Sequence, residues 1–190
     1  MTHPLSLSMI WNDPDWTGVI RAYEQYSQYE RLETLFERPW GIHGVHHAWR
    51  VLFHTLVLCR LCRIDEADRN LLASASLFHD IGRENDGRCY RHGRLSVEKM
   101  KLLKLFPADP ASAERLNFII SYHCIEDDEC RSALQRLDCV DPDKTWRLFG
   151  IFKDADGLDR VRIGDLDVRY LRNMESLRME RLASELFAKI

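Results

Sequence analysis

The sequence contains the segment Leu71-Leu72-Ala73-Ser74-Ala75-Ser76-Leu77-Phe78-His79-Asp80-Ile81-Gly82, in which an apolar run leads to a histidine and an aspartate. A helix with so few polar residues is mostly buried, and Gly82 is expected to end it. Two strong metal-ligand side chains there need a partner, because an unpaired buried charge is costly. A divalent cation is a suitable partner, since positive charge is favoured at a helix C-terminus. For an isolated pair, the alternative is a core histidine with a capping aspartate.

The overall composition is that of a soluble globular protein. Among 190 residues, 27 Lys and Arg stand against 30 Asp and Glu, which gives a formal charge of −3. This balance argues against a surface that coats nucleic acid. The longest apolar stretch, 49–62, contains Arg50, His54 and Arg60, and it is too short and too polar to span a membrane.

The N-terminus and the cysteines indicate the compartment. No basic segment followed by an apolar one opens the chain, so no targeting peptide is visible. We expect the six cysteines to be reduced thiols in a cytoplasmic protein. Cys59-x-x-Cys62 lies inside a helical pattern, which favours a packed helix over a zinc or redox site.

Helical periodicity covers most of the chain, and no stretch shows the alternation of a strand. We therefore predict an all-α protein with a single domain over 1–190. An aromatic helix over about 15–36 belongs to an N-terminal extension of about 1–38. A core of about 40–172 carries the motifs, and a last helix spans about 170–190. The aromatic helix is expected to pack on the core, with a homodimer interface or one wall of a substrate cleft as alternatives.

Acidic residues followed by Pro or Glu mark three helix starts. They are Asp13-Pro14, Asp65-Glu66 and Asp141-Pro142, in which the aspartate caps the helix and proline fits the first turn. Residues 1–12, which precede the first of these starts, are expected to form a loose or docking arm.

Histidines lie on the face or at the start of three predicted helices. Helical spacing places His47, Val51, His54 and Leu58 on one face, with Arg50 beside His47. In the same way, His92 opens a helix, and His123 shares an apolar face with its neighbours one and two turns earlier. Neutral imidazole is an excellent ligand for divalent metals. The alternative is a satisfied core histidine for His47 and His123, and a simple helix cap for His92.

The last acidic cluster lies near the end of a helix. Phe149, Phe152, Asp156 and Asp159 lie on one stripe, so we expect Asp156 to point into the protein and Asp154 to point outward. One turn on, Asp159 could hydrogen-bond a ligand histidine from behind.

Together, these elements offer imidazole and carboxylate groups in the order His47, His79, Asp80, His92, His123 and Asp156. Donors of this kind, without cysteine, suit Mn, Fe, Co, Ni or Mg better than a structural zinc site. The chance convergence of so many separate elements is improbable, so we predict that these residues bind one or two divalent ions.

With these residues in this order, the sequence resembles the HD-domain superfamily of metal-dependent phosphohydrolases. The motifs are His43-Gly-x-x-His47-x-x-Arg50-Val51-Leu52, His79-Asp80-x-x-Arg83-Glu84-Asn85-Asp86-Gly87, His92-Gly93 and Asp154-Ala155-Asp156-x-Leu158-Asp159, and they look closest to a group of small bacterial HD proteins. The resemblance covers about residues 40–172. HD-GYP cyclic-dinucleotide phosphodiesterases follow the doublet with Lys and a Gly-Tyr-Pro element. Here Arg83 stands at that position and no Gly-Tyr-Pro occurs, so that substrate is not expected.

The resemblance implies an HD-domain-like helical bundle with a metal site at its centre. By the family pattern, His47, His79, Asp80 and Asp156 hold a first metal. His92 and His123 are placed as in families that hold a second metal, with the doublet Asp80 bridging the two ions.

The resemblance also implies a reaction. Two divalent ions can activate a bridging water and clamp phosphoryl oxygens for in-line attack. We expect Asp80 and Arg83 to be catalytic. Arg83 and Arg50 would bind phosphate, and Asp86 would contact the substrate.

The expected substrate is a small phosphorylated molecule, nucleotide-like, cleaved at a phosphoester or phosphoanhydride. Two alternatives stay open, namely an HD-fold di-iron oxygenase and a non-catalytic nucleotide-binding regulatory protein.

Overall fold

The computed structural model describes residues 4–137 and 141–190. The first three residues of the expected arm, and the predicted thiol of Cys139, lie outside these ranges. Every regular element in the described ranges is a helix, which confirms the all-α prediction. No helix there is long and apolar enough to cross a membrane.

The α-helices are α1 (Leu7–Asn12), α2 (Thr17–Ser27), α3 (Val45–Leu61), α4 (Glu66–Phe78), α5 (His92–Leu102), α6 (Pro110–Tyr122), α7 (Asp127–Arg136), α8 (Pro142–Leu158) and α9 (Glu180–Phe187).

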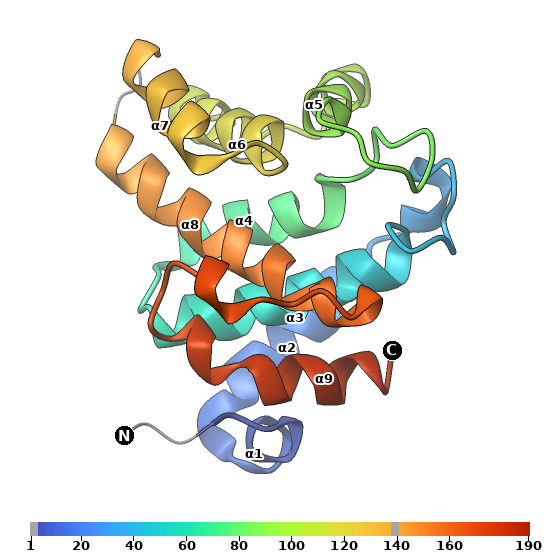
Figure 1. The fold of residues 1–190 in the computed structure, drawn as a ribbon, viewed down its shortest axis with the longest axis vertical. Coiled ribbons are helices and arrows are strands. Elements are labelled where there is room, and N and C mark those ends of the chain that lie inside the picture. The colour runs from blue at the N-terminus through green and yellow to red at the C-terminus, as the bar shows by residue number, and fades with distance from the viewer. Residues whose placement is uncertain (1–3, 138–140) are drawn as a thin grey trace.

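Helix α3 is the centre of the bundle. It contacts α2, α4, α8 and α9, and Val51, Leu52 and Phe53 are inaccessible to solvent. Such burial on successive residues is possible only because neighbours cover the helix all round. Figure 1 shows α5, α6 and α7 at one end of the molecule and α1, α2 and α9 at the other. The C-terminal ends of α4 and α8, at Phe78 and Leu158, are buried inside the protein.

The helix starts follow the capping rules that the sequence predicts. Asp65 and Asp141 accept hydrogen bonds from the backbone N–H groups of Asp68 and Lys144. Asp13 likewise accepts from Asp15 N–H at the start of a short 3₁₀ turn (Pro14–Trp16). Each carboxylate satisfies an N–H group that has no partner within the helix.

The N-terminal region differs from the prediction in two ways. The arm contains the short helix α1, and the expected helix over 15–36 divides into α2 and a 3₁₀ turn (Leu32–Leu35). The break occurs at Arg31, whose φ of 62° is incompatible with a continuous right-handed helix. Val19 and Ala22 of α2 are buried, so one side of the aromatic segment packs on the core.

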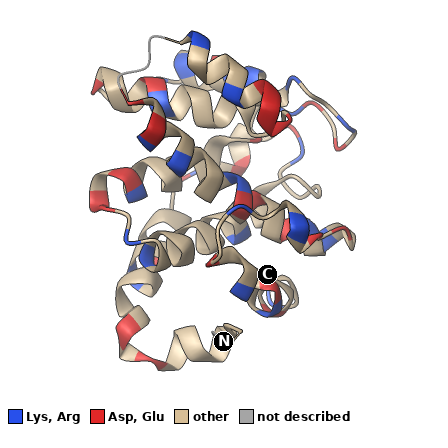
Figure 2. Cartoon of the chain, turned by 60° about the vertical axis from the view of Figure 1, so that its left-hand side comes forward, with Lys and Arg blue, Asp and Glu red and all other residues tan. Residues whose placement is uncertain are grey.

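The C-terminal region is also less helical than expected. Short 3₁₀ turns at Asp159–Ile163, Val168–Tyr170 and Ser176–Arg178 precede α9, which begins only at Glu180. In the view of Figure 2, acidic and basic residues are interspersed along the ribbon.

Gly82 does not cap a left-handed turn as expected. Helix α4 ends at Phe78, and Gly82 is not among the residues with positive φ. A Cβ atom at Gly82 would lie 2.1 Å from the backbone nitrogen of Ser96, while Gly82 N–H donates to Ser96 Oγ at 2.8 Å. Glycine is therefore required for the close approach of α5 to the segment that carries His79 and Asp80.

Candidate metal centre

Asp80 is the central carboxylate of the candidate site. It follows α4 directly, and only 2% of its side chain is exposed. Its Oδ2 atom lies 3.6 Å from Nε2 of both His47 and His79. Its Oδ1 atom lies 3.2 Å from His92 Nε2 and 3.6 Å from His123 Nε2. The two oxygens of one carboxylate thus face two different pairs of histidines.

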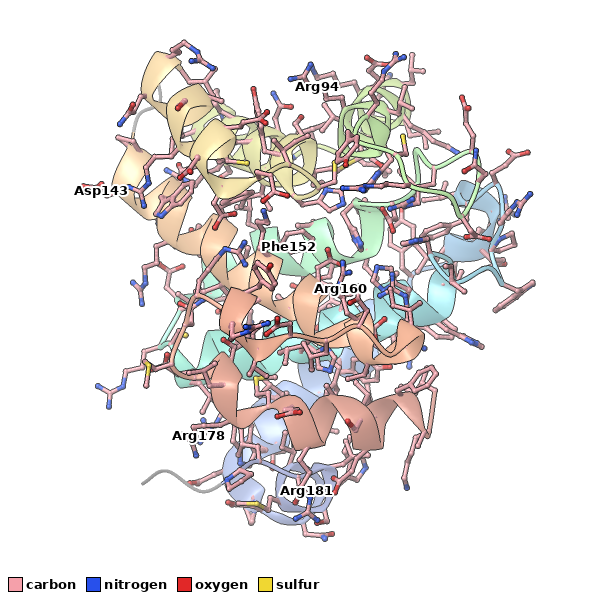
Figure 3. The ribbon with its side chains drawn as sticks, in the orientation of Figure 1. Arg94, Asp143, Phe152, Arg160, Arg178 and Arg181 are labelled. Atoms are coloured by element: carbon pink, nitrogen blue, oxygen red, sulfur yellow. The ribbon has the colours of Figure 1, made fainter. Side chains whose placement is uncertain are left out.

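The first group of donors comes from α3, α4 and α8. The Nε2 atoms of His47 and His79 are 3.1 Å apart, and Asp156 Oδ1 lies 3.3 Å and 3.8 Å from them. Phe152, labelled near the middle of Figure 3, packs its ring 5.4 Å from the ring of His79. The side chain of Asp156 is 28% exposed, so solvent reaches the group from that side.

The second group comes from α5 and the end of α6. The Nε2 atoms of His92 and His123 are 2.8 Å apart. Arg83 donates from Nε to Asp80 Oδ1 at 2.9 Å, and one of its terminal nitrogens lies 3.4 Å from His92 Nε2. The guanidinium therefore lies at the edge of this group.

Hydrogen bonds on the far side of each ring orient the four histidines. His79, His92 and His123 donate from Nδ1 to the backbone carbonyls of Ser76, Cys89 and Ile120. His47 donates from Nδ1 to Asp159 Oδ2 at 2.7 Å. Because Nδ1 carries the proton, Nε2 of a neutral ring presents its lone pair to the centre.

The electrostatics favour ionised carboxylates beside neutral imidazoles. Burial lowers the pKa of His79 to about 4 and that of His92 to about 3. Although burial opposes the ionisation of Asp80 and Asp156, the nearby histidines hold both carboxyl pKa values well below their usual range. For His47, burial favours the neutral ring, but hydrogen bonds to carboxylates outweigh this and raise its pKa.

Asp159 supports His47 from behind and is fully buried. Besides His47, it accepts hydrogen bonds from Arg50 Nε at 2.6 Å and from a terminal nitrogen of Arg50 at 3.0 Å. The position behind a candidate ligand histidine is the one that the sequence predicts for Asp159.

Two expectations need correction. Arg50, expected to bind phosphate, is 4% exposed and lies behind His47 with its guanidinium on Asp159. Asp154, expected to point outward, is fully buried. It accepts hydrogen bonds from the backbone N–H groups of Arg172 and Asn173 and from the Ser176 hydroxyl, because the C-terminal segment covers that side of α8.

The other candidate residues lie outside the two groups. Asp86 is 3.4 Å from Arg38 on an exposed loop, and the structure brings it to none of the six candidate ligands. His54 is a core histidine, whose Nδ1 lies 3.3 Å from the carbonyl of Ala155 and whose pKa burial lowers to about 4.

His43 and Arg162 lie at the site although the sequence assigned them no role. His43 Nδ1 is 3.0 Å from Asp80 Oδ2 and 3.1 Å from a terminal nitrogen of Arg162. The four-residue spacing between His43 and His47 was a usable signal for His43. No comparable signal marked Arg162, which follows the last motif.

These residues fit divalent cations. The Nε2 atoms of His47 and His79, and those of His92 and His123, face each other at hydrogen-bonding distance. Two facing nitrogen lone pairs repel each other unless a proton or a cation lies between them. Nitrogen and carboxylate donors suit first-row divalent metals. The first group offers His47, His79, Asp80 and Asp156, and the second offers His92, His123 and the other oxygen of Asp80.

A family model matches the part of the chain that carries these residues. The family model of the HD domain matches residues 44–160, a range that contains all six candidate ligands. No curated protein and no solved structure matches the chain. Because the matched range is more than half of the sequence, the protein belongs to the HD domain family, whose members are in general metal-dependent phosphohydrolases.

Proposed function

We propose that the protein hydrolyses a phosphoester or phosphoanhydride of a small, nucleotide-like substrate with a metal-activated water. The observation that carries the proposal is the placement of Asp80, whose two oxygens face two separate histidine pairs. A carboxylate in that position can bridge two ions. We therefore propose two divalent metals per chain, from the group Mn, Fe, Co, Ni and Mg.

The chain's own residues hold and orient the reacting groups. Two divalent ions, when bound, would lower the pKa of a shared water and neutralise charge on phosphoryl oxygens. His47, His79, Asp80 and Asp156 would hold the first ion, and His92 and His123 would complete the second site with Asp80. Burial excludes water from all of these residues except on the side of Asp156.

Arg83 is the residue best placed to bind phosphate. Its side chain is 12% exposed, and its Nε–H group holds Asp80 while another nitrogen donates to the carbonyl of Gly87. An arginine beside two bound cations can place a planar pair of donors on a phosphate. We propose that Arg83 binds the substrate phosphate. Asp86, on the same loop, stays a proposed substrate contact.

The loop that follows Arg83 supports a nucleotide-like substrate. Tyr90 is 53% exposed, and the guanidinium of Arg88 lies 4.9 Å from the centre of its ring. Exposed aromatic and guanidinium planes can stack on a base and contact phosphate. Substrates with both a base and a phosphate are therefore the first class to test.

The test is a hydrolysis screen of nucleotides and of p-nitrophenyl phosphate with Mn²⁺, Co²⁺, Ni²⁺ or Mg²⁺. We expect phosphate release that stops when a chelator is added and that is absent in Asp80→Ala. His46→Ala is the matched control, because His46 is exposed and packs on Trp40 and Trp49. Turnover that survives in Asp80→Ala would refute the proposal.

The same donor set also suits iron, which favours a di-iron oxygenase as the second candidate. Tightly bound iron and oxygen consumption with an organic substrate, without phosphate release, would select it. A non-catalytic nucleotide-binding protein is the third candidate. It would bind nucleotides without turnover, and it gives no reason for six converging ligands.

A further inference from the structure

His43 is a fifth histidine at the candidate metal centre, and it faces the centre differently from the others. The four candidate ligand histidines present Nε2 and hold Nδ1 against the protein. His43 instead presents Nδ1, at 3.0 Å from Asp80 Oδ2. Its side chain is 17% exposed, so it lines the edge of the site.

The loop that carries His43 is held in one conformation. Gly44 N–H donates to the carbonyl of Gly41, and Val45 N–H donates to the carbonyl of Pro39 at 2.8 Å. A Cβ atom at Gly44 would lie 2.1 Å from that same carbonyl oxygen of Pro39. The position of His43 is thus fixed by the backbone as well as by Asp80.

Arg162 joins this loop to the residue behind His47. It donates from Nε to the carbonyl of Ile42 at 2.9 Å. One terminal nitrogen donates to the backbone carbonyl of Asp159 at 3.0 Å and lies 3.4 Å from Asp159 Oδ2. Its side chain is 6% exposed, so water competes little for these contacts.

Two neighbours compete for the Nδ1 atom of His43. Asp80 can only accept a hydrogen bond and Arg162 can only donate one. Arg162 donates to Ile42 and Asp159 from its other two nitrogens, so it stays anchored when Nδ1 carries a proton. We therefore assign the Nδ1 proton to the contact with Asp80.

The contacts close a ring around the first metal position. Asp80 contacts His43, the His43 loop is tied through Arg162 to Asp159, and Asp159 orients His47. His47 Nε2 then returns to Asp80 Oδ2 at 3.6 Å. A shift of the loop would move two of the four donors to this ion.

We propose that His43 and Arg162 are positioning residues of the metal centre. His43 fixes Oδ2 of Asp80 by a hydrogen bond from Nδ1 without binding the ion itself, and Arg162 anchors the loop to Asp159. The inference rests on the proposed function, since it concerns the same metal site. A carboxylate oxygen has lone pairs for both a hydrogen bond and a cation.

The test is Mn²⁺ binding to metal-free, full-length protein, measured by calorimetry and by competition with a coloured chelator. Residues behind a metal ligand affect metal affinity by about 10- to 100-fold. We expect a loss of this size at the tighter site in His43→Ala and His43→Gln, with the number of bound ions at saturation unchanged. His43→Asn should bind within about threefold of wild type, because the amide of asparagine can occupy the place of Nδ1.

His46→Ala is the control, and Arg162→Ala should weaken binding in the same direction as His43→Ala. If His43→Ala does not fold, the contrast between the Asn and Gln variants carries the test. Wild-type Mn²⁺ affinity in His43→Ala or His43→Gln would overturn this inference but not the proposed function. The same holds if His43→Asn binds Mn²⁺ as weakly as His43→Gln. Loss of one bound ion at saturation would make His43 a ligand and also overturn it. A wild-type protein that binds no metal would overturn the proposed function as well.

Discussion

Replacing Asp159 by Asn removes a buried negative charge that Arg50, His47 and Arg162 share. Arg50 donates twice to this carboxylate and His47 donates once, at 2.6–3.0 Å. Asparagine keeps one acceptor oxygen and turns an N–H₂ group towards these donors. Breaking a buried pair by removing one partner costs about 3–5 kcal/mol, against a total stability of roughly 5–15 kcal/mol for a typical domain.

The pH dependence of the wild type gives a second estimate. Burial opposes ionisation of Asp159, but the hydrogen bonds from His47 and Arg50 lower its pKa from 3.8 to about 2. A pKa that is lower in the folded state contributes stability above the unfolded pKa and loses it as pH falls through the folded value. The contribution is about 2 kcal/mol, present above about pH 4 and lost towards about pH 2. The substitution costs more than this because it also leaves Arg50 buried without a counter-charge.

The assay is urea unfolding of wild type and Asp159→Asn, without metal, at pH 7 and at steps down to pH 3. We expect Asp159→Asn to be less stable by about 3–5 kcal/mol at pH 7 and to lose less stability than wild type below pH 4. Asp165→Asn is the control, since its partner is the exposed Arg160 and surface pairs contribute about 1 kcal/mol or less. A variant within about 1 kcal/mol of wild type at pH 7 would show that the Asp159 carboxylate is not a major source of stability.

Three further outcomes follow from the geometry. Asp154→Asn should cost about 2–4 kcal/mol and speed amide exchange over 171–178, because the buried carboxylate holds that segment; unchanged exchange there would contradict this role. Gly82→Ala should destabilise by about 1–3 kcal/mol, since its Cβ would meet Ser96 at 2.1 Å. Gly18→Ala, with open space around it, should not destabilise. Mn²⁺ at about 100 times its Kd should raise stability by about 2.7 kcal/mol and Tm by roughly 5–11 °C, and a Tm unchanged by Mn²⁺ would count against the metal site.

Helices were predictable from the sequence where residues within the helix, or next to it, determine where it starts and whether it is buried. Capping aspartates such as Asp65 and Asp141 mark helix starts because the cap is made within one turn of chain. The apolar run before His79 marks a buried helix because a helix that is apolar on all sides is covered by its neighbours. A helix break was not predictable where it depends on one non-glycine residue with a left-handed backbone conformation, such as Arg31.

The two errors at the site have a common physical cause. Periodicity assumes that a helix has one buried face, but α8 is covered on the Asp154 side by the segment 172–176. Arg50 was expected to face a phosphate because guanidinium groups suit phosphate. The structure shows a buried carboxylate, Asp159, already in its reach. Both outcomes depend on contacts between segments far apart in the chain, which spacing alone does not reveal.

Metal content is the first measurement to make, because Asp80 is proposed to join two metal positions. Elemental analysis of the purified protein, loaded with Mn²⁺ and freed of excess ion, should be made beside Asp80→Ala and His46→Ala. We expect about two ions per chain in wild type and in His46→Ala, and loss of both in Asp80→Ala. A single ion per chain would leave His92 and His123 as structural residues. No bound ion in wild type, or ions retained in Asp80→Ala, would contradict the claim.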